Sequence, residues 1–401
     1  MIAHCDQAHT ELSLSNDRSG AVNNPLSPEK MVKVISFIGG LLVLELFVGT
    51  IAGFTGTAEP GKTKPNPEAG GFIVEKSRDV ILSKARAEGK LRVLSSFSGE
   101  AFRRMRELMR KKYPFIDTLV EEITGPDAQQ RLLLELKAGT VKDWDVVAAT
   151  PDMYNDFVPE RKRFDILGMA QQGVLAINAR MVDPENRGVV ALGSNLCSIA
   201  YNKNLISPEK VPNTWEDFLK PEFKGKKFIL DIRPTCLAGL TVGFGEQWLV
   251  DYAKKLAAQD PVWARGFPVA MTRIAAGEYA LHQLTNYNSC MRAAAKDAAG
   301  SLVCKIIQPT PVRLMNTEFV IRTASHPYAA LLWIEMEASP EGQKVLDEHG
   351  PLNSSIYAQG KIAEAVKGLT VFVNDFKTLK NTTKWQDMAV AAFGFPSAHV
   401  K

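Results

Sequence analysis

The chain is poor in the residue patterns on which most enzyme and metal sites depend. It has five cysteines and six histidines in 401 residues. No two cysteines have the Cys-x-x-Cys spacing, which argues against a zinc ribbon or a thioredoxin-like redox site. Neither His-Glu-x-x-His nor Gly-x-Ser-x-Gly occurs, so a zinc protease or an α/β-hydrolase is not expected. We therefore predict no catalytic residues, no cofactor and no enzymatic activity.

A strong excess of charge is also missing. The formal net charge is +4, which is too small to indicate a nucleic-acid partner. The densest basic run, residues 103–112, alternates with apolar residues at helical spacing. This pattern is typical of the solvent-facing side of an amphipathic helix.

One long apolar run is present, at residues 34–54. It follows Met31 and Lys33 and ends in small residues before Ala58. A short basic start, an apolar centre and small residues at the end are typical of an export signal, which we place at residues 31–58. The alternative is a membrane anchor through residues 34–54, because about 20 apolar residues can span a bilayer.

The segments around this run follow from that prediction. Residues 1–30 are a polar, non-globular extension that is not translated if synthesis starts at Met31, and residues 59–74 form a linker rich in Pro and Gly. In an oxidising compartment Cys197, Cys236, Cys290 and Cys304 could form one or two disulfides. Their pairing is left open, and small buried residues are the alternative.

Alternating apolar strands and amphipathic helices predict two α/β units, the first with a parallel sheet. The expected strands are residues 91–94, 118–123, 145–149, 173–178, 227–232, 279–284 and 303–307, with an extended segment at 312–321. The expected helices include residues 75–88, 100–112, 125–139, 327–337 and 340–350. Thr214 should cap a short helix through a capping box with Asp217.

Ten short motifs occur in an order and spacing that are specific when taken together. They are Leu-Arg-Val-Leu-Ser-Ser at 91–96, Lys-Tyr-Pro at 112–114, Glu-Leu-Lys-Ala-Gly at 135–139, Asp-Trp-Asp-Val-Val at 143–147, Ala-Tyr-Asn-Lys at 200–203, Pro-Asn-Thr-Trp-Glu-Asp at 212–217, Phe-Lys-Gly-Lys at 223–226, Ala-Gly-Glu at 276–278, His-Pro-Tyr-Ala-Ala at 326–330 and Ser-Pro-Glu-Gly-Gln at 339–343. On these motifs the chain resembles a periplasmic solute-binding protein of an ABC importer, in the group that includes ferric-iron-binding proteins. The resemblance covers roughly residues 89–360.

The resemblance implies a two-lobed, type II periplasmic-binding fold with two crossover strands. Lobe one would comprise residues 75–193 and 310–401, and lobe two residues 194–309. The crossovers would fall near 193–195 and 308–312. The ligand would lie between the lobes, and a membrane permease would receive it.

Polar residues that follow predicted strands are the candidate ligand contacts, because ligands of open α/β sheets lie at the carboxyl ends of the strands. Hydroxyls, amides and guanidiniums at such positions suit a carboxylate, a phosphate or a metal–anion complex. The candidates are Ser95, Ser96, Ser98, Thr150, Ser194, Asn195, Arg233, Thr235, Asn286, Tyr287 and Arg313. Each could instead be a cap or turn residue.

Direct binding of ferric iron is an open question at this point. The resemblance implies two adjacent tyrosines as metal ligands in lobe two, but the corresponding segment reads Asn286-Tyr287-Asn288. Tyr287 is thus the one candidate metal ligand. The missing second tyrosine makes a small anion or a chelated metal at least as plausible a ligand as bare iron.

Three hypotheses follow. The first is a monomeric periplasmic protein that captures a small solute or ferric iron. The second is a membrane-tethered sensory module of the same fold. The third, a periplasmic enzyme, has the least support, because no reactive set of residues is found.

Overall fold

The computed structural model describes residues 71–97, 99–123, 125–350 and 352–394. They belong to one unit of the chain, residues 64–401. The polar extension, the apolar run and most of the linker lie outside the described residues, so the export signal and the anchor stay predictions. Within the described part, no helix is both long and apolar enough to cross a membrane.

The strands of the described residues form a ten-stranded arrangement in the order β2-β1-β3-β9-β4-β7-β5-β6, with β10 beside β9 and β8 beside β4. The first group comprises β2 (Asp117–Glu122), β1 (Lys90–Ser95), β3 (Val146–Ala149) and β10 (Val371–Asn374). The second group comprises β7 (Leu281–Asn286), β5 (Ile229–Asp231), β6 (Val262–Ala264) and β8 (Leu302–Lys305).

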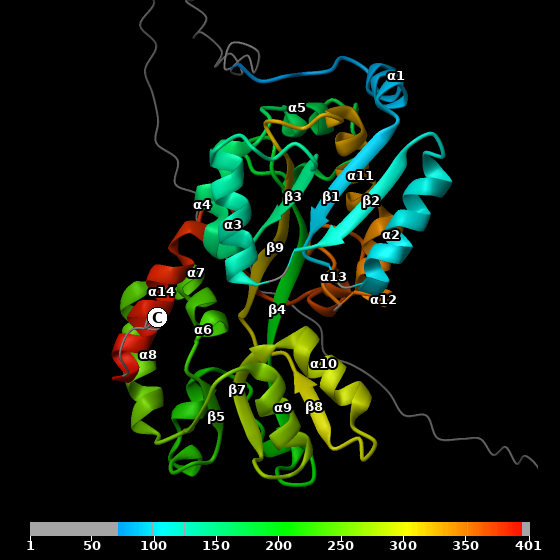
Figure 1. Cartoon of the computed structure of the whole chain (residues 1–401). Helices are drawn as coiled ribbons and strands as arrows, with labels where there is room; N and C mark the ends of the chain where they lie inside the picture. The colour runs from blue at the N-terminus through cyan, green and yellow to red at the C-terminus, as the bar shows by residue number, and fades with distance from the viewer. Residues whose placement is uncertain (1–70, 98, 124, 351, 395–401) are drawn as a thin grey trace, which may run out of the picture. The chain divides into compact units, whose positions relative to one another are not determined.

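Two long strands connect the groups, and one of them, β4, pairs with strands of both. The first half of β4 (Val190–Asn202) pairs with β9 (Thr310–Val320), whereas its second half, from Cys197 onward, pairs with β7 and β8. Figure 1 shows β4 and β9 side by side as they leave the first strand group. These strands are the two crossovers that the resemblance implies.

The three strands whose alternation with helices predicted a parallel sheet are parallel, but the complete sheet is mixed. β1, β2 and β3 are parallel, but β9 runs antiparallel to both β3 and β4. The reason is topological: a strand that returns from the second group enters the first sheet from the opposite end.

Helices cover both strand groups. Those of the first group are α1 (Arg78–Glu88), α2 (Gly99–Lys112), α3 (Pro126–Lys137), α4 (Tyr154–Phe157), α5 (Ile166–Gln171), α11 (Pro327–Ala338), α12 (Pro340–Glu348) and α13 (Lys361–Ala365). Those of the second group are α6 (Thr235–Gly239), α7 (Thr241–Phe244), α8 (Glu246–Ala258), α9 (Phe267–Ala275) and α10 (Tyr287–Lys296). We call the buried apolar residues of the first strand group the first core and those of the second strand group the second core. The central helix of the first core is α11, in which every residue from Ala329 to Ala338 is buried.

The last helix, α14 (Thr382–Phe393), departs from the expected domain boundary. We expected residues 310–401 to lie in lobe one, but Trp385, Ala389 and Phe393 belong to the same hydrophobic core as Leu249 and Tyr252 of α8. Figure 1 shows α14, in red, alongside α8. The spacing of four residues places these apolar side chains on one helix face, and only the second core offers that face a partner.

The strand expected at residues 173–178 does not form. Gly173 has a φ of +73°, and the amides of Val174 and Leu175 both donate to the carbonyl of Met169. The amide of Ala176 donates to Glu335 Oε1 at 2.7 Å. The side chains of Val174, Leu175 and Ile177 are buried, but the backbone completes a helix end and a side-chain bond instead of a ladder.

Two disulfides close within the second strand group. Cys197 of β4 is bonded to Cys236 of α6, and Cys290 of α10 is bonded to Cys304 of β8. The two bonds therefore hold helices against opposite parts of the same sheet.

Candidate functional site

A row of polar residues crosses the two crossover strands and β10. Asn195 on β4 is the register partner of Arg313 on β9, and Arg313 is in turn the partner of Asn374 on β10. Register partners place their side chains on the same face of a sheet. The row therefore gathers two amides and a guanidinium where the chain passes between the strand groups.

Two carbonyl oxygens of this row are buried and have no hydrogen-bond partner among the described residues. Asn195 and Asn374 are 5% and 1% exposed, and no hydrogen bond from the described residues reaches the Oδ1 atom of either. Their Nδ2 groups, in contrast, donate to Asn286 Oδ1 at 2.7 Å and to Thr382 Oγ1 at 2.8 Å. A buried acceptor without a donor is costly unless water or a ligand reaches it.

The second strand group contributes a neighbouring set of polar residues at the ends of β5 and β7. Asn286 is the last residue of β7 and is held by Asn195, while Thr235 Oγ1 accepts a bond from Gln386 Nε2 at 3.1 Å. Arg233 is exposed, and its amide donates to Asp231 Oδ1 at 2.7 Å. Burial raises the pKa of the Asp231 carboxyl, and this amide opposes the shift.

The void beside this loop is small. It is lined by residues that include Arg233, Thr235 and Gln283, and its volume is about 10 Å³. A water molecule needs roughly 10–15 Å³ of such space. This particular void therefore cannot hold a solute unless the surrounding residues move apart.

In the first strand group the predicted residues have different surroundings. Ser96 is exposed and donates to Asn316 Oδ1 at 3.2 Å, and Thr150 is half-buried at the end of β3. Ser95 and Ser194 are fully buried: Ser95 donates to Glu318 Oε1 at 2.7 Å, and Ser194 Oγ accepts from the Ile356 amide at 2.9 Å. These internal partners suit a structural role, and ligand contact by either hydroxyl stays a prediction.

Ser98 lies outside the described residues. Its place in the site therefore also stays a prediction.

Tyr287 is separated from the polar row by its surroundings. Although it directly follows Asn286, its ring packs against an apolar cluster that contains Leu196, Val312 and Ile362. Burial raises the pKa of the Tyr287 phenol above its ordinary value of 10.0. Both observations disfavour the phenolate form, which a ferric ion would need.

No other side chains nearby form a recognisable metal site. His282 is fully buried on β7, and burial lowers its pKa to about 3. Within the described ranges, no three His, Cys, Asp or Glu residues are grouped as metal ligands.

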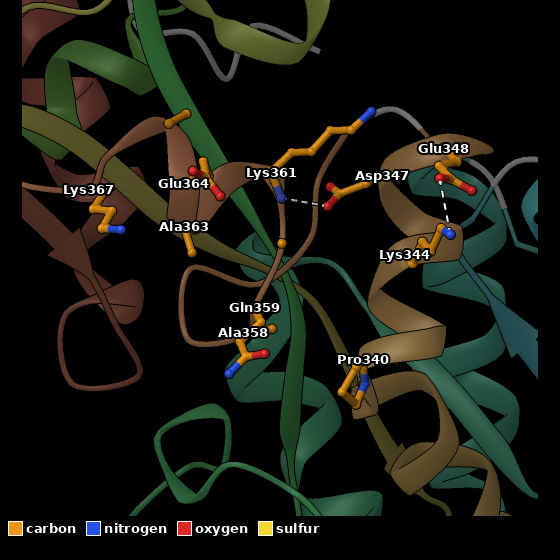
Figure 2. Close-up of a pocket in the computed structure, with 12 residues that line it drawn as sticks. Pro340, Lys344, Asp347, Glu348, Ala358, Gln359, Lys361, Ala363, Glu364 and Lys367 are labelled. Atoms are coloured by element: carbon orange, nitrogen blue, oxygen red, sulfur yellow. Dashed lines mark hydrogen bonds and ion pairs between the residues drawn. The ribbon is translucent and has the colours of Figure 1, made fainter.

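A cavity of about 850 Å³ lies between α12 and α13 (Figure 2). It carries three lysines and three carboxylates, namely Lys344, Lys361, Lys367, Asp347, Glu348 and Glu364. Lys344 pairs with Glu348 at 3.8 Å, and Asp347 Oδ2 accepts the backbone amide of Lys361 at 2.7 Å. None of the predicted ligand residues that the structure describes lines this cavity, and its charges balance.

Three residues of the site were not found from the sequence. Asn374, Gln386 and Asn316 follow or precede no predicted strand end. Asn374 and Gln386 lie in a C-terminal segment for which we predicted no element, and Asn316 lies inside a strand. Their polarity alone gave no signal, because strand register and helix packing bring them to the site.

Comparison with protein families and solved structures places the fold. A family model described as bacterial extracellular solute-binding protein matches residues 149–382. No curated protein sequence matches the chain.

Several solved structures share the fold. Iron-bound HitA from Pseudomonas aeruginosa is 14% identical, with a TM-score of 0.54, over 76% of this chain and 99% of that chain. The Trichodesmium protein IdiA (FutA), in complex with iron and citrate, is 19% identical, with a TM-score of 0.58, over 76% and 98%. Ferric iron-binding protein A from Mannheimia haemolytica, in an open conformation, is 16% identical, with a TM-score of 0.58, over 76% and 98%. At these identities the likeness concerns the fold, and it confirms the predicted two-lobed α/β architecture.

Proposed function

Because the chain belongs to the family of bacterial extracellular solute-binding proteins, we propose that it captures a small anionic solute and delivers it to the membrane permease of an ABC importer. Members of this family bind solutes and do not transform them, in agreement with the prediction that the chain is not an enzyme.

The polar row on the crossover strands is the observation that carries this proposal. Arg313 lies on β9 and Arg233 lies two residues after β5, and in the sheet order the strands of Asn195 and Asn286 lie between β9 and β5. Guanidinium and amide groups together suit carboxylate or phosphate oxygens. The buried, unpartnered Oδ1 atoms of Asn195 and Asn374 would also accept bonds from hydroxyl or amine groups of such a solute.

Capture would proceed by closure of the lobes about β4 and β9. In this fold class the strand ends of both lobes face the ligand, so closure removes it from water and joins surfaces of both lobes for the permease. A ligand shifts the population toward the closed form only by its extra contacts in that form. We propose a periplasmic, monomeric protein with residues 31–58 as its signal.

We favour an anion, free or bound to a metal, over direct coordination of ferric iron. Some structural neighbours are described as iron-bound, but this chain has one tyrosine at the corresponding segment, and Tyr287 packs in an apolar cluster. A ferric chelate presents carboxylate oxygens to the protein and does not need a phenolate ligand. It therefore remains within the proposed ligand class.

A thermal-shift screen of the mature protein tests the proposal. Small carboxylates, phosphonates, sulfonates, ferric citrate and ferric chloride are compared, since a ligand at 100 times its Kd stabilises a protein by about 2.7 kcal/mol. At least one anion should raise the melting temperature of the wild type, and the shift should shrink in Asn195→Ala. The matched control is Asn213→Ala, an exposed asparagine of the capping-box loop. No shift from any class, in folded and ligand-free protein, would overturn solute capture.

The tethered alternative is tested separately. The N-terminus of the exported chain, determined by mass spectrometry, should lie near residue 59. A chain that retains residues 34–54 would favour the membrane-tethered module.

A further inference from the structure

The disulfide between Cys197 and Cys236 lies among the predicted ligand residues of the second strand group. Cys197 is two residues after Asn195 on β4 and is the register partner of Asn286 on β7. Cys236 directly follows Thr235 at the start of α6. Its Sγ lies 3.4 Å from Asn286 Oδ1, the atom that also accepts the Asn195 side chain at 2.7 Å.

The bond joins two elements that reach the site by different routes. β4 enters from the first strand group, whereas the loop at Arg233 and Thr235 follows the short strand β5, which is separated from β4 by β7. Other contacts hold this loop against β6 and α14: the Ile232 amide donates to the Ala264 carbonyl, and Thr235 Oγ1 accepts a bond from Gln386 Nε2. The disulfide is thus a covalent link across β7 to the crossover strand.

The second disulfide offers an internal comparison. Cys290 and Cys304 join α10 to β8 and are 14 residues apart in the sequence. Cys197 and Cys236 are 39 residues apart. Cys290 is three residues after Tyr287 on α10, but it is bonded to Cys304 of β8, which pairs with the distal part of β4, residues 199–202. The first bond therefore contacts the polar row through Asn286, whereas the second ties α10 to the distal part of the sheet.

We propose that the Cys197–Cys236 disulfide is a positioning element of the ligand site, which holds Arg233, Thr235 and Asn286 in place beside Asn195 before the ligand arrives. The inference rests on the proposed function for its ligand. The claim that the disulfide holds these residues in place does not depend on that function. A preorganised site loses less conformational freedom on binding, so the affinity rises without any new contact.

Amide hydrogen exchange in the ligand-free, full-length protein tests the positioning role. The amides of Ala238 and Leu240 donate within the α6 region at 2.8 and 3.0 Å. In Cys197→Ala/Cys236→Ala these amides should exchange about tenfold faster or more, since local opening becomes easier. In Cys290→Ala/Cys304→Ala they should keep wild-type rates under conditions in which both variants are fully folded. Equal rates in the two variants would overturn the proposal.

Two further measurements keep the test decisive. If the first variant does not fold, wild-type exchange serves instead: α6 amides that exchange more than about a hundredfold faster than β4 amides, with the disulfide intact, would refute a clamped loop. Isothermal titration with citrate and with ferric citrate should show about tenfold weaker binding in the first variant only. If neither probe binds even the wild type, the proposed ligand class fails while the exchange result still decides the positioning role.

Discussion

Glu318 of β9 and Glu337 of α11 form a buried carboxyl pair that should make the stability of the fold fall as the pH rises. Both side chains are fully buried, and Glu318 accepts the Ser95 hydroxyl at 2.7 Å. Burial raises the pKa of both carboxyls, and the Glu318 charge raises that of Glu337 further. The folded protein therefore keeps a proton at pH values where the unfolded chain has lost it. This contribution is complete below the unfolded pKa and is lost as the pH rises toward the folded pKa.

The size of the effect follows from one bound proton. A single extra proton in the folded state changes the free energy of unfolding by about 1.4 kcal/mol per pH unit. Each pH unit over which only the folded state keeps this proton therefore lowers the free energy of unfolding by about 1.4 kcal/mol. Against a total stability of about 5–15 kcal/mol for an ordinary domain, this change is easily measured.

Urea unfolding of the wild type and of Glu337→Gln at pH 5, 6 and 7 is the assay. The glutamine keeps the shape and the hydrogen-bonding capacity of the protonated acid but cannot titrate. Wild-type stability minus variant stability should fall as the pH rises from 5 to 7, by at most about 1.4 kcal/mol per pH unit. A difference that stays flat or rises with pH would refute the reasoning.

Asp217→Asn is the matched control for this assay. Lys220 lowers the pKa of the Asp217 carboxyl to about 2, below its ordinary value of 3.8. The stability that Asp217 contributes is present above that ordinary value and is lost only as the pH falls toward 2. Its difference curve should therefore be flat between pH 5 and pH 7.

Three further predictions concern the site and the two cores. Tyr287→Phe should change the affinity for ferric citrate by less than about threefold in calorimetry, because an apolar pocket disfavours the phenolate; a loss of about a hundredfold would make Tyr287 a metal ligand. Removing the disulfide between β4 and α6 should cost about 4 kcal/mol in urea unfolding, against about 3 kcal/mol for the bond between α10 and β8, because the first closes the longer loop; the reverse order would indicate strain in the first bond. Trp385→Ala should cost about 3–5 kcal/mol in the same assay, since it empties a site in the second core; a loss below about 1 kcal/mol would show that α14 packs only loosely.

Local sequence patterns predicted the elements whose ends carry capping residues. The capping box is the clearest case: the Thr214 amide donates to Asp217 Oδ2 at 2.9 Å, and the Asp217 amide donates to Thr214 Oγ1 at 3.2 Å. The turn that it starts is a short 3-10 helix, Glu216–Leu219. The cap chemistry was readable because it involves residues three apart.

Elements that depend on distant partners were harder to predict. The strand β10 has four residues and pairs with β9, about 60 residues earlier, and α14 packs on a helix more than 130 residues before it. The spacing of Trp385, Ala389 and Phe393 indicates a helix, but the sequence could not show which of the two cores this helix packs against. The site was limited in the same way, because the pairing of Asn195 with Asn286 depends on the register of β4 against β7.

The packing of α14 also sets the order in which the chain can fold. Residues 197–307 supply most of the second core, yet that core stays incomplete until residues 385–393 leave the ribosome. In the first strand group one buried cluster is complete at residue 346, whereas the other also needs Phe376 and Leu379. Apolar surface on α6 and α8 is therefore exposed throughout synthesis, and this surface is what a chaperone that keeps nascent chains unfolded would recognise.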